Sequence, residues 1–379
     1  MARNLGLAVS LLITPFLAAG AQERLPFSDG RWDLRGDSTA VDTVEGRESV
    51  RVMTGFAFRR DVKFVDGTID LDVMMSSRRS FVFVSFRMQS DDEYEDFYLR
   101  PHKSGLPDAV QYAPVWQGQG SWQLHHGPGE TAAATIPVGT WTRLRVVVSG
   151  QRAALFVGDT VRPVLITRLT RPPLAGYLAL GGFLPAGSMG TGYSARFSDV
   201  RVRPGVVSYV FADTTSARPA PSGVVGTWRI GQPFTPPDSG VSTLAGLPQG
   251  AVSRTGIISA DRTGLVAFHP SVRLPTPGRS AAGIVASLRI TAESAGPRRL
   301  DLGFSDIATV FLNGRPLARL DASYSYEGRR EGVIGFNQST LFLPLERGPN
   351  ELTVVVTDSF GGWGLMGRFP DMRGLVVSP

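Results

Sequence analysis

The sequence predicts an all-β protein built of two β-sandwich (jelly-roll) domains in tandem. Short runs of alternating or β-branched residues recur about every ten residues, and Gly, Pro, Asp and Ser bound them, whereas helical periodicity is almost absent. The 44 glycines and 27 prolines suit the many tight turns that join short strands. Two domains are expected because 379 residues exceed the size at which one hydrophobic core usually keeps growing.

Residues 1–21 have the pattern of a signal peptide. Arg3 supplies the positive end, residues 5–17 are mostly apolar, and residues 19–21 give the small-x-small pattern before a cut at Gln22. An uncleaved anchor is the alternative, although the apolar run is short for a bilayer. No later stretch is long and apolar enough for a membrane helix. We therefore expect an exported protein, secreted or periplasmic, with no integral membrane segment after signal removal.

The domain boundaries follow from composition. Strand-like runs fill residues 22–205, which we assign to the first domain. Residues 206–223 include a stretch rich in Thr, Ser, Ala and Pro, which is typical of a linker. Strand-like runs resume in residues 224–379, the second domain.

Composition also excludes several classes of function. The chain has no cysteine, which rules out thiol catalysis and cysteine-ligated zinc or iron–sulfur sites. Only Lys63 and Lys103 are lysines among the 39 basic residues, and the arginines are interleaved with acids along the chain. They form no basic stripe, so we expect no nucleic-acid partner.

Residues 91–122 form the most informative window. They combine His, Trp, Tyr and Arg with several glutamines, a mixture that a buried strand does not need but that a surface for a polar ligand does. The alternative is that the aromatic residues only fill the core. We assign the ligand-binding candidates in and near this window to Arg87, Tyr98, Arg100, His102, Gln111, Trp116 and Trp122.

Alternation along two strands divides this window into two faces. In residues 81–88, Val82, Val84 and Phe86 point one way, and Phe81, Phe83, Ser85 and Arg87 point the other. In residues 97–102, Phe97 and Leu99 face the core, and Tyr98, Arg100 and His102 lie opposite. If the two strands pair, Arg87 and Arg100 share one face with Tyr98, and Gln111 and Trp122 extend it. Such a surface would suit sugar rings, whose flat faces stack on aromatic side chains.

The ordered motifs of the first domain resemble those of the concanavalin A-like lectin/glucanase jelly roll, including its laminin-G-like versions. They are Phe56 with Phe58, residues 64–73, residues 82–87, residues 98–101, residues 139–141 before 143–147, and residues 154–158. The resemblance covers roughly residues 26–202. It implies a sugar binder, an adhesion module or a glycosidase, because the family includes all three.

Catalysis would need two carboxylates across the scissile bond. The E-x-D-x-x-E strand motif of the family has no match here, and the nearest acidic cluster is Glu93, Glu95 and Asp96. Three interpretations stay open for that cluster: a solvated turn, a calcium-binding loop, or a pair of catalytic acids. His125 and His126 lack a third ligand at metal spacing. We therefore expect no metal site and no cofactor, apart from a structural calcium ion in that loop.

The second domain resembles the galactose-binding-like β-sandwich. The resemblance rests on residues 310–317, which read as two short strands around an Asn-Gly turn, and on residues 342–356. Many domains of that superfamily bind no sugar. Glycines beside Trp363 could leave its ring open, so Trp363, Tyr324 and Arg368 are the candidates here, and packing of Trp363 inside the sandwich is the alternative.

Three functions follow from these observations. The first is an exported protein that binds a carbohydrate or glycoconjugate without catalysis. The second is a secreted glycoside hydrolase that uses an acid pair near Glu93–Asp96. The third is a cell-surface scaffold whose partner is another protein.

Overall fold

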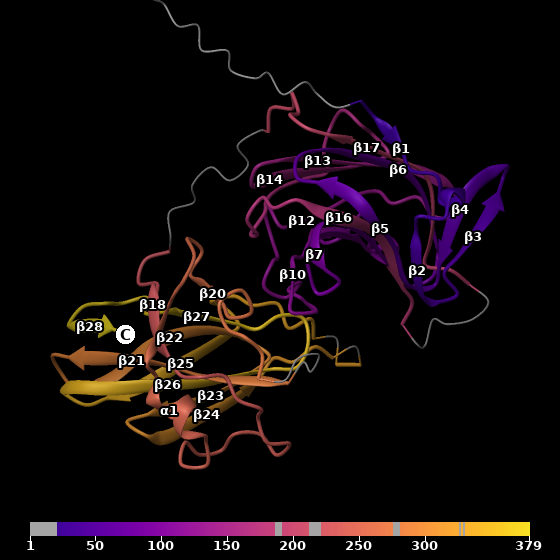
Figure 1. Ribbon diagram of the computed structural model, residues 1–379. Helices are drawn as coiled ribbons and strands as arrows, with labels where there is room; N and C mark the ends of the chain where they lie inside the picture. Colours follow the sequence, from indigo (N-terminus) through magenta and orange to yellow (C-terminus); the bar gives the residue numbers. More distant parts are fainter. Residues whose placement is uncertain (1–20, 186–191, 212–220, 276–280, 326, 329) are drawn as a thin grey trace, which may run out of the picture.

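The computed structural model describes residues 21–185, 192–211, 221–275, 281–325, 327, 328 and 330–379. The predicted signal peptide, except Ala21, and residues 212–220 of the predicted linker lie outside this part of the chain. Almost all regular secondary structure in the described residues is β-strand, so the all-β prediction is confirmed (Figure 1). The exceptions are the short helices η1 (Phe27–Asp29), η2 (Pro101–Lys103) and α1 (Gln249–Ser253). None of these helices has the length and apolar character needed to cross a bilayer.

Two antiparallel sheets pack face to face in the first half of the chain. The first sheet has the order β15-β14-β13-β6-β17-β4-β3, with β1 beside β17. Its strands are β1 (Glu23–Arg24), β3 (Ala40–Val44), β4 (Arg47–Val52), β6 (Gly67–Met75), β13 (Trp141–Ser149), β14 (Arg152–Val157), β15 (Leu165–Arg168) and β17 (Ala195–Pro204). We call this the eight-stranded sheet.

The second sheet of this sandwich has the order β11-β10-β8-β7-β16-β5-β2, with β9 beside β8 and β12 beside β9. Its strands are β2 (Asp33–Asp37), β5 (Thr54–Phe64), β7 (Phe81–Ser90), β8 (Glu93–Leu99), β9 (Val110–Tyr112), β10 (Val115–Trp116), β11 (Gln119–Gly120), β12 (Thr131–Ala132) and β16 (Gly176–Phe183). We call this the nine-stranded sheet.

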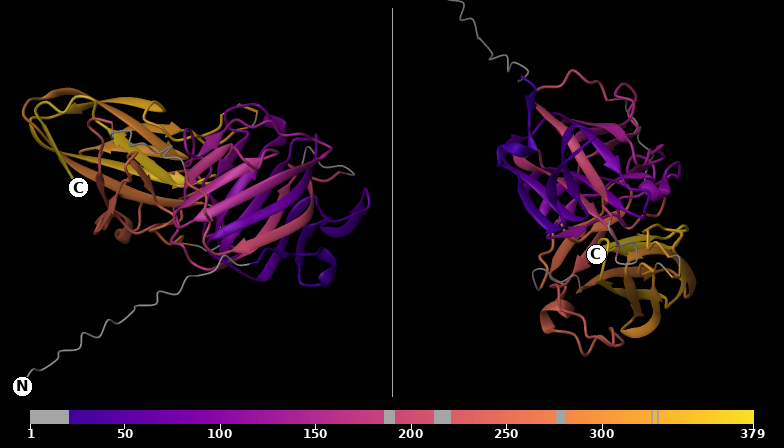
Figure 2. Two further views of the ribbon diagram at one scale, coloured as in Figure 1. Left: turned by 90° about the horizontal axis from the view of Figure 1, so that it is seen from above. Right: turned by 90° about the vertical axis from the view of Figure 1, so that its right-hand side faces the viewer.

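A second sandwich follows, as Figure 2 shows from two further directions. Its larger sheet contains β18 (Thr227–Ile230), β19 (Gly256–Ser259), β21 (Ala282–Ala292), β23 (Ile307–Leu312), β24 (Arg315–Asp321), β26 (Gly348–Asp358) and β28 (Leu375–Ser378). Its smaller sheet contains β20 (Leu265–Ala267), β22 (Gly296–Ser305), β25 (Ser339–Leu345) and β27 (Gly364–Arg368).

The core of the first sandwich follows from strand alternation. Val82, Val84 and Phe86 of β7 point inward and meet the inward residues of the eight-stranded sheet, such as Leu71 and Val73 of β6. Full burial of one such side chain contributes about 1.5 to 3 kcal/mol relative to exposure. The same alternation turns every second residue of β5, β7, β8 and β16 to the outer face of the nine-stranded sheet.

The two sandwiches dock through residues 116–125 of the first. The side-chain amide of Gln117 donates to the carbonyls of His269 (2.9 Å) and Val272 (2.8 Å) and accepts from the Leu274 N–H (2.8 Å). Gln123 bonds to the second sandwich through both backbone and side chain, and its partners include the carbonyl oxygens of Gly361 (2.9 Å) and Glu331 (3.0 Å). We call this contact the domain junction.

Candidate functional site

The register of the nine-stranded sheet sets six residues in one row across its outer face. Arg35 lies opposite Phe56, Phe56 and Phe83 each lie opposite Gly181, and Tyr98 lies opposite Phe83. Gln111 completes the row beside Tyr98. Partners across neighbouring strands point to the same face, so these side chains form one continuous surface. We call the surface formed by Phe56, Phe58, Phe81, Phe83, Tyr98, Tyr177 and Phe183 the aromatic face.

The rings at the centre of the aromatic face are nearly parallel. Phe56 lies 5.6 Å from Phe58 at 28° and 5.8 Å from Phe83 at 23°, measured between ring centroids and ring planes. A side chain on Gly181 would meet the Phe56 ring, since an added Cβ would lie 2.3 Å from its Cε1. Glycine at this position therefore lets the Phe56 ring lie down on strand β16.

Further rings extend this surface toward the edge of the sheet. Phe83 contacts Tyr98, with 5.9 Å between centroids, and Phe81 contacts Phe183 at the same distance. Phe56, Phe81 and Phe83 are partly exposed, and Phe183 is 42% exposed. The aromatic face is therefore available to a ligand rather than closed into a core.

One acid lies in the row next to these rings. Asp96 of β8 faces Ser85 of β7, whose hydroxyl donates to Asp96 Oδ1 over 2.8 Å. Burial raises the pKa of Asp96 to about 8, because only the single Ser85 hydrogen bond opposes the loss of water around the carboxyl group. Asp96 is therefore mostly protonated at neutral pH and can donate a hydrogen bond as well as accept one.

Charged groups close the aromatic face at the β2 edge. The Arg60 guanidinium lies over Phe58 (4.5 Å) and Tyr177 (4.9 Å), measured to the ring centroids. Its two terminal nitrogens donate to the two oxygens of Asp91 over 2.7 and 2.9 Å. The Tyr177 hydroxyl donates to the same carboxylate. These bonds hold the pKa of Asp91 below its usual value, with Arg60 the largest cause.

The placement of Arg87 on this face is wrong. Arg87 has a φ of 51°, and the pairing of β7 with β8 shifts register between Phe86 and Ser90, so alternation breaks at this point. The side chain is 2% exposed and donates to the Val65 carbonyl (2.7 Å), the Gly150 carbonyl (2.7 Å) and Asp66 (2.9 Å). Arg87 therefore holds turns together and cannot reach a ligand.

Arg100 and Gln111 lie beside Tyr98, as predicted, but their polar atoms are used within the protein. One Arg100 nitrogen donates to the Tyr98 hydroxyl and to Gln111 Oε1, and another donates to the Asp108 carbonyl over 2.6 Å. The Gln111 amide donates to the carbonyls of Trp122 (2.7 Å) and His125. Both side chains therefore position the segment that docks the second sandwich.

His102 lies at the end of the aromatic face. Its ring packs edge-on against Phe81, with 5.2 Å between centroids, and Nδ1 lies 3.1 Å from the Ser80 carbonyl. Loss of water on the packed side, followed by the nearby Arg79 cation, lowers the pKa of His102 to about 4, although the side chain keeps an exposed edge. His102 is therefore a neutral hydrogen-bonding group at neutral pH.

The two tryptophans lie at the domain junction rather than on the aromatic face. Trp122 meets Tyr324 and Phe360 of the second sandwich, with 5.7 and 6.1 Å between centroids. The Arg171 guanidinium lies 3.8 Å from the centroid of Trp116, which faces a cavity that both sandwiches line. Trp122 nevertheless lies next to Tyr98, because the Arg100 guanidinium lies 4.3 Å from the Tyr98 centroid and 6.0 Å from the Trp122 centroid.

The acidic cluster separates into three environments. Glu95 is fully buried and accepts from the Tyr112 hydroxyl (2.6 Å) and from the Arg171 backbone N–H (3.1 Å). Glu93 pairs with the Arg171 guanidinium over 2.6 Å. Asp96 alone faces the aromatic face. Adjacent strand residues point to opposite faces, so Glu95 and Asp96 cannot act across one cleft as a catalytic pair.

The second-domain candidates also have structural partners. Trp363 is fully buried, its ring lies 5.1 Å from Phe268, and Nε1 donates to the Val356 carbonyl over 3.2 Å. A surface role for Trp363 is therefore wrong. Arg368 donates to Asp301 over 2.5 Å. The Tyr324 hydroxyl accepts from Arg79 over 2.8 Å and so belongs to the domain junction.

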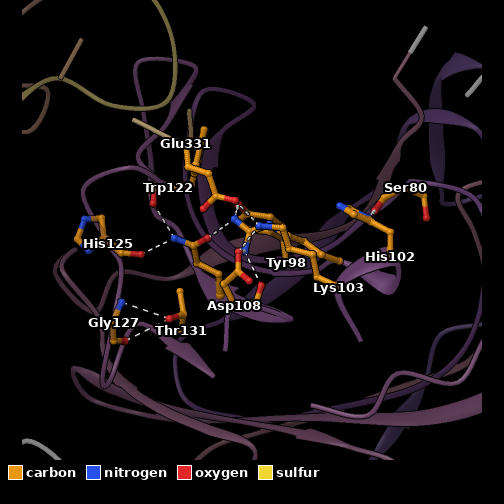
Figure 3. Close-up of polar contacts among 12 residues, drawn as sticks. Ser80, Tyr98, His102, Lys103, Asp108, Trp122, His125, Gly127, Thr131 and Glu331 are labelled. Atoms are coloured by element: carbon orange, nitrogen blue, oxygen red, sulfur yellow. Dashed lines mark hydrogen bonds and ion pairs between the residues drawn. The ribbon is translucent and has the colours of Figure 1, made fainter. Parts of the chain in front are cut away.

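One group in the described part of the chain has metal-ligand geometry. Oxygen and nitrogen atoms of Asp108, His126 and Glu331 lie within 4.8 Å of one another. Lys103 already occupies this group, because its amine donates to Asp108 over 2.5 Å and to Glu331 over 2.6 Å (Figure 3). The cluster is therefore a salt-bridge network across the junction.

Sequence reasoning missed Phe56, Phe58, Tyr177 and Phe183 as members of the aromatic face, in which Phe58 is buried and the other three are at least partly exposed. The alternation of Phe56 and Phe58 in β5 was visible, but only the pairing of β5 with β16 and of β16 with β7 shows that these rings join Phe83. Such pairings link residues far apart in the sequence, such as Phe56 and Gly181 or Gly181 and Phe83, which local patterns do not encode.

No protein-family model matches the chain, and no curated protein matches it. Solved structures of similar fold include a β-glucanase of Bacillus licheniformis, which is 10% identical, with 50% of this chain and 100% of that chain covered and a TM-score of 0.37. The carbohydrate-binding module CBM66 from Bacillus subtilis is 16% identical, with 50% and 98% covered and a TM-score of 0.31. A prokaryotic β-1,3-1,4-glucanase from a mouse hindgut metagenome is 11% identical, with 50% and 100% covered and a TM-score of 0.38. Likeness at this level concerns strand arrangement and carries no information on ligand or activity.

Proposed function

We propose that the protein is an exported glycan-binding protein that holds sugar rings on the aromatic face. The observation that carries the proposal is the row Phe56, Gly181, Phe83 and Tyr98, in which the partly exposed rings of Phe56 and Phe83 lie beside the buried ring of Tyr98. Sugar rings present apolar C–H faces that stack on such surfaces, while their hydroxyls need polar partners at the margin.

Polar partners of suitable kind border the rings. The Arg60 guanidinium and His102 lie at opposite margins, whereas Asp96 and Ser85 of the next row are buried beside the rings. At neutral pH the exposed, neutral imidazole of His102 can donate or accept, which suits hydroxyl groups. The charge of Arg60 is balanced by Asp91, and that of Arg35, which lies over Phe58, is balanced by Asp33.

The separation of Glu95 from Asp96 favours binding over cleavage, because the acid pair that cleavage would need is not assembled. The second sandwich, with its galactose-binding-like motifs, then acts as a rigid neighbour of the binding domain. An exported location agrees with this proposal because free glycans and glycoconjugates are abundant outside the cell membrane.

The test is a glycan array followed by calorimetric titration of the best ligand. Phe56→Ala and Phe83→Ala should each weaken binding about tenfold, which corresponds to about 1.4 kcal/mol. Phe342→Ala is the matched control, because Phe342 is 64% exposed on the second sandwich and distant in sequence from the aromatic face. An array without any hit, or unchanged affinity in both aromatic-face variants, would contradict the proposal.

A further inference from the structure

A cavity of about 270 Å³ lies where the two sandwiches meet. The first sandwich lines it with Trp116, Ser121 and His125, and the second with Ser259, Asp261 and Leu265, among others. This cavity is separate from the aromatic face, since neither Phe56 nor Phe83 lines it. Both sandwiches must be docked for it to exist.

Several polar groups around the cavity have no partner in the described part of the protein. Asp261 Oδ1 accepts from Thr263 and from the Leu265 N–H, whereas Oδ2 makes no hydrogen bond. The hydroxyls of Ser121 and Ser259 and the Trp116 Nε1–H also make none. Asp261 and Ser259 are exposed, so water bonds to them in the free protein, and the hydroxyls of a ligand can take the place of that water.

The remaining walls are apolar. One side of the Trp116 ring is covered by Arg171, whose charge is taken up by Glu93 at 2.6 Å. Trp116 nevertheless stays partly exposed, and Ala260, Leu265 and Pro270 add hydrocarbon surface. An aromatic ring with apolar walls on one side and scattered hydroxyl partners on the other suits an amphipathic ring.

The size of the cavity and the charge of its lining residues limit which ligands it can bind. A volume of about 270 Å³ is at the lower limit of small-molecule pockets, which begin near 300 Å³, so it holds one sugar ring rather than a chain. Asp261 is the one carboxylate among the lining residues, and no lysine or arginine lines the cavity. An anionic ligand would be repelled, and a neutral one would not.

We propose that the junction cavity binds one neutral pyranose ring, stacked on Trp116 and hydrogen-bonded to Asp261 and to the hydroxyls of Ser121 and Ser259. This is a second site, and it is independent of binding on the aromatic face. Because its walls come from both sandwiches, the bound sugar favours the docked arrangement by mass action.

The test uses the full chain and the methyl pyranosides of glucose, galactose and mannose as probes, with ligand-observed NMR and calorimetric titration. At least one neutral probe should bind in the millimolar range or tighter, and glucuronic acid should bind at least fivefold more weakly than that probe. Ser259→Phe, at an exposed position of β19, should fill the cavity and abolish the binding. Trp116→Ala should weaken it at least fivefold.

Asp261→Asn serves as a second variant that keeps the fold, since the Asn oxygen can still accept the bonds from Thr263 and Leu265. Asp261→Asn should weaken binding of the neutral sugar. It should also remove the preference for the neutral sugar over glucuronic acid, because the negative charge at this position is gone. Phe83→Ala should leave this binding unchanged, which separates the junction cavity from the aromatic face. The proposal would be overturned if none of the three neutral probes bound the parent protein. It would also be overturned if Ser259→Phe and Trp116→Ala bound the probe as tightly as the parent does, or if Phe83→Ala lost the binding.

Discussion

Glu95 and Asp96 are neighbours in the sequence, but their carboxyl groups lie on opposite faces of the nine-stranded sheet. Glu95 accepts from the Tyr112 hydroxyl inside the sandwich, and Asp96 accepts from Ser85 beside the aromatic face. Burial raises the pKa of both carboxyl groups. Glu95 is thus an acid of the sandwich core, whereas Asp96 is an acid buried on the outer side of the same sheet.

The first prediction concerns pH. Because the pKa of Asp96 is raised to about 8 in the folded protein, the folded state keeps its proton between about pH 4 and about pH 8 while the unfolded state loses it. The stability that Asp96 contributes is therefore present at low pH and is lost as pH rises, by up to about 1.4 kcal/mol per pH unit. Asp96→Asn should remove this slope and raise the unfolding temperature at pH 8.

The measurement for Asp96 is the unfolding temperature of parent and variant from pH 5 to pH 9. Other buried acids contribute slopes of their own, so the difference between the two proteins is the quantity to compare. Asp37→Asn, at an exposed position of β2, is the control and should track the parent. A constant difference between parent and Asp96→Asn across this range would show that Asp96 titrates normally.

A second prediction concerns the packing of the Phe56 ring on Gly181. Gly181→Ala would place a Cβ 2.3 Å from the Phe56 ring, which must then tip away from the strand. Glycan affinity should fall by about as much as in Phe56→Ala, with little loss of unfolding temperature, because the displaced ring is partly exposed. Gly120→Ala is the matched control, since no atom lies within 4 Å of its added Cβ. Unchanged affinity in Gly181→Ala would mean that the ring orientation does not matter.

Alternation in the sequence was sufficient to sort β7 and β8 into a core face and an outer face. It placed Val82, Val84 and Phe97 inside and Phe83 and Tyr98 outside, as the structure does. It failed at Arg87, because a residue with positive φ shifts the register and turns the side chain inward. No local pattern signals such a shift without the partner strand.

The interpretation of the glutamine and tryptophan residues failed for a different reason. Gln111, Gln117 and Trp122 have the chemistry expected of ligand contacts, and they do make polar and aromatic contacts. Gln117 and Trp122 contact the second sandwich of the same chain, and Gln111 holds the segment that carries Trp122. A surface that binds a domain and a surface that binds a ligand have the same composition, so only the assembled fold can separate the two.

A third prediction tests the domain junction. Gln117→Ala would leave the carbonyls of His269 and Val272 and the N–H of Leu274 without their partner, at a cost of about 1 to 3 kcal/mol for each group that stays buried. The two sandwiches should then unfold in separate thermal steps, and small-angle scattering should show a larger radius of gyration. Gln119→Ala on the same hairpin is the control, because its side chain has no hydrogen bond to the described residues. A single unfolding step at the parent temperature would contradict the role of Gln117.

A fourth prediction concerns Trp363. Since this side chain is fully buried against Phe268, Trp363→Ala should destabilise the second sandwich by about 3 to 5 kcal/mol. The loss should appear in chemical unfolding followed by fluorescence, with glycan affinity on the aromatic face unchanged at temperatures where the protein stays folded. Phe342→Ala, at an exposed site of the same sandwich, should lower the free energy of unfolding only slightly. If the Trp363→Ala protein were as stable as the parent, the burial of Trp363 in the core of the second sandwich would be contradicted.

The hydrogen bonds of the junction constrain the two halves of the chain unequally. Gln117 and Gln123 of the first sandwich use their side chains, whereas Val272, Leu274 and Glu331 answer with backbone atoms. Backbone atoms persist through almost any substitution. Substitutions at Val272 and Leu274 therefore leave the bonds to Gln117 intact, whereas Gln117 itself cannot be replaced without losing them. Elsewhere in the junction the second sandwich does contribute side chains, since the Ser305 hydroxyl donates to Gln123 and the Glu331 carboxylate pairs with Lys103.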